Sequence, residues 1–230
     1  MNALAVDCAS NTLTVSAKKN NDFMQTTMQM GLRQSEKLLP IIDSLLKELN
    51  LSAKELDYTA LTIGPGSFTG LRLGAATLKA LTLANGTPLY GLNSLDVYAH
   101  AFLGCGKTIL SLVESKDAEF FYALYENEKR ITDVCVGNAD EVFNAIASYE
   151  TVIATGPGTE RLISLADETQ KAVLKTVQPH ITDGRVLFNL AEDAIAKKEP
   201  ALKDYDGPVY YKKSEAELVL ERKASETPST

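Results

Sequence analysis

The sequence predicts an α/β protein made of two similar units, each a mixed sheet covered by helices. Each half of the chain has three strand-like runs and then alternating helix-like and strand-like segments, the order typical of such a sheet. Each half also places a Gly-Pro-Gly turn directly after a strand, at residues 64–66 and 156–158. The 230 residues, 45% of them apolar, suffice for one large or two small domains. The recurring order favours two copies of one unit.

The first unit begins with three strands. They are expected over residues 2–6, 12–17 and 23–30, because these are short runs rich in apolar and β-branched residues, and the first two are separated by a turn. Asp7 ends the first strand, and Asn11 suits the tight turn that follows it.

Helices and two further strands complete this unit. Leucine and isoleucine recur at the i, i+3, i+4, i+7 spacing over residues 35–49, which predicts an amphipathic helix, and Ser52 with Glu55 forms a capping box for a short second helix. The remaining elements are expected as a strand over 58–63, a helix from Ser67 to about residue 84 ended by Asn85-Gly86, a strand over 88–92 and a helix from residue 93 or 94 to about 102.

The second unit repeats this order. Strands are expected over 108–113, 118–125, 131–136, 151–154 and 173–177, with helices after 138, after the turn 155–159 and over 182–198. A short strand is expected over 209–211, and residues 227–230 are expected to be disordered. The division is therefore into residues 1–104, residues 105–206 and a C-terminal segment, 207–230.

The two units differ in charge. Residues 1–105 contain 8 basic and 8 acidic residues, whereas residues 106–230 contain 15 and 22, which accounts for the net charge of −7. A protein that binds nucleic acid unaided usually carries a basic face, so strong binding of that kind is disfavoured. The neutral unit is freer to pack against a partner.

Three cysteines, Cys8, Cys105 and Cys135, lie far apart and form no Cys-x-x-Cys pair, which predicts buried structural thiols in a reducing compartment. The first residues lack the basic region of a signal peptide, and the longest uncharged run, 80–95, is too short and broken to span a bilayer. We expect a soluble cytoplasmic protein.

The segment from Gly64 to Arg72 is the outstanding motif. A glycine-rich turn between a strand and a helix can hold a phosphate on its backbone N–H groups. Its spacing matches neither the Walker loop nor the dinucleotide fingerprint, and Pro65 lacks one of the N–H groups needed. Ser67 does not stand in a nucleophile elbow, because Pro65 and Thr69 replace the flanking glycines; a helix N-cap explains it better.

The helix that follows this turn is apolar on almost every side. Such a helix is covered all round, either as a central core helix or as a helix whose second face meets another chain. Small residues such as Ala75 allow close approach, and the wide apolar stripe of residues 35–49 supports the second interpretation.

Few side chains are suited to catalysis. His100 and His180 are isolated, so no metal site is expected. Asp7 could lie near a nucleotide in a phosphotransfer fold, but an acid at this place more often caps a turn.

Five stretches resemble the bacterial TsaB family, also called YeaZ. They are residues 7–11 (DCASN), 34–40 (QSEKLLP), 64–72 (GPGSFTGLR), 91–95 (GLNSL) and 208–211 (PVYY). The resemblance covers most of the chain, more weakly in the second half, and departs from the family's usual histidine at Gln34.

The resemblance implies a two-lobed fold of the actin, sugar-kinase and heat-shock-protein-70 type. It implies a cytoplasmic, non-catalytic subunit that binds and activates the transferase TsaD in the threonylcarbamoylation of adenosine 37 of tRNA. The ATPase TsaE is implied as a further partner, with tRNA bound only through the complex and a homodimer through the same surface. No metal and no cofactor is implied for the chain itself; whether ATP or ADP binds at the interface with TsaD is left open.

By this resemblance, residues of two helices form the partner surface: Leu38, Ile41, Ile42, Leu45, Ser67, Phe68, Thr69, Leu71, Arg72 and Ala75. A degenerate nucleotide cleft is expected at Asp7, Ser10, Gly64 and Gly66. The alternative is a small ATPase or kinase-like enzyme that uses Asp7 in this cleft. The family has also been described as a glycoprotease. This function is discounted, because the sequence contains neither a recognisable set of metal ligands nor a recognisable Ser-His-Asp arrangement.

Overall fold

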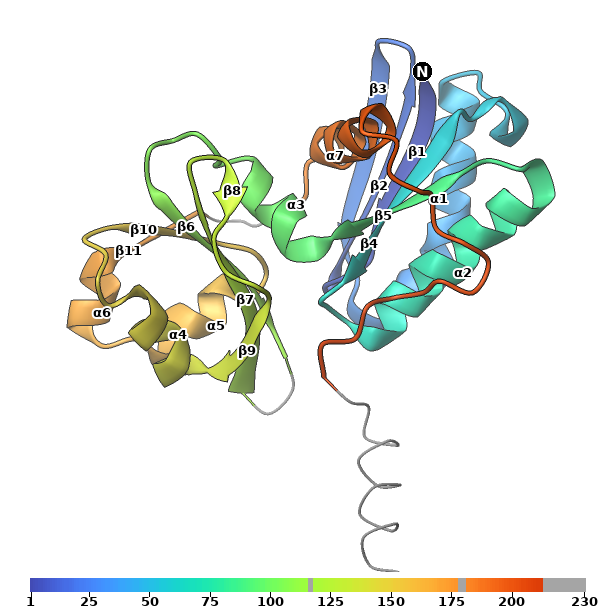
Figure 1. The fold of residues 1–230 in the computed structure, drawn as a ribbon. Coiled ribbons are helices and arrows are strands. Elements are labelled where there is room, and N and C mark those ends of the chain that lie inside the picture. Colours follow the sequence, from blue (N-terminus) through green and yellow to red (C-terminus); the bar gives the residue numbers. More distant parts are fainter. Residues whose placement is uncertain (116–117, 178–180, 213–230) are drawn as a thin grey trace, which may run out of the picture.

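The computed structural model describes residues 1–115, 118–177 and 181–212, which form two lobes side by side (Figure 1). The predicted disorder of residues 227–230 and the isolated His180 lie outside the described residues. No helix of the described chain is long and apolar enough to cross a membrane.

Lobe I contains a five-stranded sheet in the order β3-β2-β1-β4-β5. The strands are β1 (Asn2–Asp7), β2 (Thr12–Lys19), β3 (Asp22–Gln29), β4 (Tyr58–Gly64) and β5 (Leu89–Asn93). The first three strands pair antiparallel, and β4 and β5 continue the sheet in parallel with β1.

Three helices cover this sheet. On one face lie α1 (Gln34–Glu48) and α2 (Phe68–Asn85), and on the other lies α7 (Gly184–Ala196) (Figure 1). Alternation along β1 divides the core accordingly, since Leu4 and Val6 pack with α1 and α2 whereas Ala3 and Ala5 pack with α7. Two single-turn 3-10 helices, η1 (Gly31–Arg33) and η2 (Ala53–Glu55), precede α1 and β4.

Lobe II repeats the topology. Its strands are β6 (Thr108–Glu114), β7 (Glu119–Glu126), β8 (Lys129–Arg130), β9 (Cys135–Asn138), β10 (Val152–Thr155) and β11 (Leu174–Thr176), and its helices are α4 (Ala139–Ile146), α5 (Thr159–Leu165) and α6 (Glu168–Val173). The order β9-β7-β6-β10-β11, with β8 added beside β7, matches that of lobe I strand for strand. The predicted duplication of a mixed α/β unit is confirmed.

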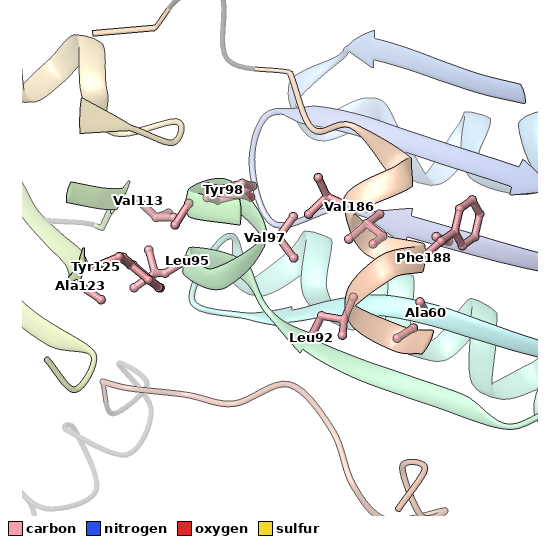
Figure 2. Close-up of a cluster of buried hydrophobic side chains, with 14 of the residues drawn as sticks. Ala60, Leu92, Leu95, Val97, Tyr98, Val113, Ala123, Tyr125, Val186 and Phe188 are labelled. Carbon is pink, nitrogen blue, oxygen red and sulfur yellow. The ribbon is translucent and has the colours of Figure 1, made fainter. Parts of the chain in front are cut away.

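The helix α3 (Ser94–His100) joins the lobes. Figure 2 shows its Leu95, Val97 and Tyr98 between side chains of lobe II and of α7. Its backbone carbonyls are bound from lobe II: Ser111 donates to Leu95 over 2.8 Å and Thr155 to Tyr98 over 3.3 Å.

The structure differs from the predicted elements in three places. The helix predicted over 182–198, within the second unit, packs as α7 on the sheet of lobe I. Of the strand predicted over 131–136 only the end forms, as the start of the short β9, and the two-residue β8 ends just before it. Residues 209–211 are no strand, although Val209 donates one backbone hydrogen bond to Ile63 on β4.

Candidate functional site

Asp7 lies at the end of β1, with 1% of its surface exposed. Its Oδ1 accepts hydrogen bonds from the backbone N–H of Ala9 (2.9 Å) and the hydroxyl of Thr62 (2.8 Å). Its Oδ2 accepts from the hydroxyls of Thr182 (2.6 Å) and Tyr98 (3.4 Å). Burial, and then the neighbouring Asp7, raise the pKa of Tyr98, so this phenol stays a donor. Asp7 caps the turn and is fully engaged within the chain.

The glycine-rich loop packs on the turn that follows β1. A Cβ atom on Gly66 would lie 2.3 Å from the Ala9 carbonyl oxygen, and one on Gly70 would lie 2.0 Å from that of Cys8. The backbone N–H of Ser67 donates to the Ala9 oxygen over 2.7 Å. These glycines therefore permit close approach of two backbone segments, which explains them without a phosphate.

The start of α2 has the predicted cap. The Ser67 hydroxyl accepts from the backbone N–H of Gly70 (3.3 Å), so this serine is a helix N-cap. The helix ends where Gly86 takes the left-handed conformation, with φ of 73°.

A cavity of about 730 Å³ separates the two lobes. Hydroxyl and amide side chains of lobe I line one wall, and the second Gly-Pro-Gly turn with α5 lines the other. Its charged groups in the described parts of the chain are Glu114, Glu160 and Arg161, so carboxylates outnumber guanidinium groups there. Of the predicted cleft residues only Ser10 lines it; Asp7 and Gly64 are buried, and Gly66 packs on Ala9.

The predicted partner surface is only partly exposed. Half of its residues are buried in the core between α1, α2 and their own sheet: Leu38, Ile42, Leu45, Leu71 and Ala75. The expectation that these side chains meet a partner is corrected, because the apolar stripe that marks each helix is the stripe that packs on the sheet. Ile41 is half-buried, and the exposed residues are Ser67, Phe68, Thr69 and Arg72.

Phe68 and Arg72 form a stacked group with Tyr210. The Arg72 guanidinium lies 3.8 Å from the centre of the Phe68 ring and donates through Nε to the Tyr210 hydroxyl over 3.0 Å. The Phe68 and Tyr210 rings lie 5.2 Å apart. Arg72 is thus held within the chain by the face of the Phe68 ring and by the Tyr210 hydroxyl.

Tyr210 belongs to a C-terminal strap, residues 202–212, which runs along α2 (Figure 1). Lys79 on α2 donates to the strap carbonyls of Lys203 (3.0 Å), Asp204 (2.7 Å) and Asp206. Near its end Tyr211 accepts a hydrogen bond from Asn93 (2.9 Å). The strap therefore fastens one side of α2 and leaves its outer side open.

The open side of α1 and α2 carries apolar side chains that periodicity alone does not single out. Leu83 is 77% exposed, Leu39 60% and Phe68 44%. Ala76 and Ala80 on α2 are also exposed. The feature of the sequence that could have indicated this open side is the lack of charged residues on α2. Only Arg72 and Lys79 are charged on this helix, and both bind the strap: Arg72 contacts Tyr210, and Lys79 contacts backbone carbonyls.

The cysteines and histidines form no cluster in the described parts of the chain, where no group of three or more His, Cys, Asp or Glu side chains is placed to hold a metal ion. Burial, and then Asp7, raise the pKa of the Cys8 thiol far above its usual range, so it is a structural thiol. Cys105 is exposed and Cys135 partly so, which corrects the expectation that all three are buried.

Two mixed sheets of one strand order, joined by helices and separated by a cavity, define the two-lobed actin-like class of α/β proteins, as predicted. The structure matches YeaZ from Pseudomonas aeruginosa with a TM-score of 0.77 over 91% of this chain and 99% of that one, at 18% sequence identity, which shows the fold.

The family described as "TsaD: tRNA N6-adenosine threonylcarbamoyltransferase" matches residues 31–191, more than half of the chain, so the chain belongs to this family. Two similar curated proteins are named "tRNA threonylcarbamoyladenosine biosynthesis protein TsaB". That of Buchnera aphidicola is 27% identical over 53% of this chain, and that of Escherichia coli is 27% identical over 56%. The chain spans 59% and 57% of the lengths of these relatives.

Proposed function

We propose that this protein is a non-catalytic subunit of the machinery that makes threonylcarbamoyladenosine in tRNA. It binds and activates the transferase TsaD, which modifies adenosine 37. The observation that carries the proposal is the open apolar side of α1 and α2, with Leu39, Phe68 and Leu83 exposed beside small residues. Isolated exposed apolar residues need no explanation, but three large exposed ones on two adjacent helices favour a protein partner.

The composition of this side fits a protein interface. Aromatic and arginine side chains dominate interface energetics, and Phe68, Arg72 and Tyr210 stand together at one end of it. Exposed alanines along α2 allow a second helix to approach closely. A homodimer would use the same side, so it would compete with the complex.

The chemistry of the cleft favours a binding role over an ATPase role. Asp7 has both oxygens engaged by two donors each, which leaves no free acid for a metal-bound nucleotide. Among the described residues, the cavity carries two carboxylates and one guanidinium, a charge balance that repels a polyphosphate. We therefore propose that the chain binds no cofactor by itself, and that the interface with TsaD is the candidate place for ATP or ADP. TsaE joins TsaD and this chain as a further partner. In this proposal tRNA binds only through the complex, because the chain carries a net charge of −7.

Sedimentation velocity of the protein mixed with the transferase of the same organism tests this proposal. Wild type is expected to form a heterodimer at the expense of any homodimer. Leu83→Asp is expected to weaken the heterodimer at least about tenfold, since it buries an unpaired charge. Leu165→Asp is the matched control, because Leu165 is an exposed leucine (40%) on α5 of lobe II. Equal binding by both folded variants would remove the assigned surface, and no complex with wild type would remove the function.

A further inference from the structure

The turn at residues 8–11 contacts three parts of the molecule: the junction between the lobes, the start of α2 and the start of α1. Through Asp7 it is tied to Tyr98 on α3 and to Thr182, which precedes α7. Both of these residues lie where the chain crosses between the lobes: α3 packs on β6 of lobe II, and Thr182 stands at the return to lobe I. Asp7 therefore connects the turn to both crossings.

The same turn supports the first residues of both surface helices. The Ala9 carbonyl accepts from the backbone N–H of Ser67, just before α2, and Gly70 packs on the Cys8 carbonyl. The Ser10 carbonyl accepts from Nε2 of Gln34 (2.7 Å), the first residue of α1. Consecutive residues thus contact the lobe junction, α2 and α1 in turn.

Gln34 is committed to this contact by burial as well as by its hydrogen bond. It is 5% exposed, and within the described part of the chain its Oε1 has no hydrogen-bond partner. Burying the Gln34 amide with its Oε1 unpaired costs free energy. The hydrogen bond from its Nε2 to the Ser10 carbonyl is therefore what keeps the side chain in this buried place. The α1 end of the connection is therefore specific to this amide.

We propose that Asp7 is a positioning residue, which fixes the starts of α1 and α2 to the junction between the lobes through the turn at 8–11. The proposal rests on the proposed function in one respect, that these helices form the docking surface. It adds that the docking surface depends on the arrangement of the lobes, since a loosened junction releases the turn and with it both helix starts. A buried carboxylate with four donors transmits such a change because each lost donor leaves an oxygen under-solvated.

Amide hydrogen exchange on the whole protein tests the connection without any partner. Thr182→Val removes one donor to Asp7 while keeping the shape of the side chain, and Thr182→Ser restores the hydroxyl. The amides of residues 68–72 and 34–38 are expected to exchange about tenfold faster in Thr182→Val than in wild type, and at the wild-type rate in Thr182→Ser. Gln34→Met is expected to accelerate residues 34–38 alone.

Thr108→Val is the matched control. It also removes a buried threonine hydroxyl that donates to a carboxylate, over 3.2 Å to Glu126, but this pair lies within lobe II, between β6 and β7. Its exchange at residues 34–38 and 68–72 should stay at the wild-type rate. Uniform acceleration in Thr182→Val, or the same pattern in Thr108→Val, would reduce Asp7 to an ordinary stabilising group and overturn the proposal. If Thr182→Val does not fold, Tyr98→Phe, which removes the longer hydrogen bond, replaces it.

Binding to the transferase then separates this inference from the proposed function. If wild type binds, Thr182→Val should bind several-fold more weakly and Thr182→Ser should recover. Selective exchange without any wild-type binding would sustain the positioning role and remove the proposed function. Unchanged binding despite faster exchange would overturn the link between the junction and the docking surface.

Discussion

The two lobes share one strand order, but they cover it with helices of different length. In lobe I, α1 and α2 have 15 and 18 residues, whereas their counterparts in lobe II, α4 and α5, have 8 and 7. A helix of two turns offers little beyond the face that packs on its sheet, whereas one of four or five turns has a second face along its length. The shared sheet therefore provides the scaffold, and the added turns in lobe I provide the open apolar side.

The helices that follow the fifth strand of each lobe are alike in two ways. Each one leaves its lobe: α3 follows β5 and contacts β6, whereas α7 follows β11 and covers the sheet of lobe I. Each is held by a tyrosine, a carboxylate and a cation. Tyr58 and Lys18 bind Glu192 on α7. Tyr125 and Arg130 bind Asp96 on α3.

The two Gly-Pro-Gly turns provide the severest test of the equivalence. Gly66 and Gly158 are the last glycines of the two turns. A Cβ on Gly66 would lie 2.3 Å from the Ala9 oxygen after β1, and one on Gly158 would lie 2.8 Å from the Glu114 backbone nitrogen at the end of β6. Gly66→Ala and Gly158→Ala are each expected to lower the free energy of unfolding by about 2 kcal/mol or more, because backbone must move. Gly66→Ala should cost more, since its Cβ would lie closer to backbone.

Urea unfolding of each variant measures these costs. Gly207→Ala serves as the control, because no atom of the described residues lies within 4 Å of its added Cβ, and it should stay within about 0.5 kcal/mol of wild type. A mild effect at one turn beside a severe effect at the other would break the comparison of the two lobes.

Sequence patterns predicted the parts of this structure that depend on residues close to one another in the chain. Leucine spacing over 35–49 and the cap at Ser67 are local, and they place α1 and α2 within a residue or so. The capping box at Ser52 forms as predicted, although on a 3-10 turn. The exposed side of α2 could not be predicted, because nearly every position of that helix is apolar.

Contacts between distant segments were beyond local patterns. Asp7 receives its donors from Thr62, Tyr98 and Thr182, which no spacing rule connects with it. The helix α7 follows lobe II in sequence, and its placement on lobe I depends on a tertiary match with Lys18 and Tyr58. For the same reason the sequence pattern allows Leu45 to be a surface residue or a core residue. Only its packing against the sheet of lobe I shows that it belongs to the core.

Removing the two tyrosine hydroxyls sharpens the comparison of the crossing helices. Tyr58 and Tyr125 are both buried, and they donate to their carboxylates over 2.9 and 2.7 Å. Tyr58→Phe and Tyr125→Phe should each lower the free energy of unfolding by about 1–2 kcal/mol. The loss should be larger for Tyr125→Phe, because Arg130 lies 3.3 Å from Asp96 while Lys18 contacts Glu192 more closely. Thermal unfolding measures both, and a larger loss at Tyr58 would reverse the order.

The smallest expected effect is a pH dependence at the α7 anchor alone. Burial acts to raise the pKa of Glu192, but hydrogen bonds from Lys18 and Tyr58 and the charge of Lys18 outweigh it, so the pKa lies below the usual 4.5. The folded state therefore holds this proton less tightly than the unfolded chain. The stability gained from ionised Glu192 is complete above pH 4.5 and is lost as the pH falls through the lower, folded-state pKa.

Urea unfolding of wild type and Glu192→Gln at a series of pH values tests this sign. The advantage of wild type should be constant at neutral pH and shrink below pH 4.5. It should amount to about 1 kcal/mol or less, because the side chain is 35% exposed and solvent screens the pair. Asp193→Asn, at the neighbouring exposed position of α7, controls for the loss of one negative charge. A difference that grows on acidification would show that Glu192 costs stability when ionised, and that packing of Tyr58 and Phe188 holds α7 instead.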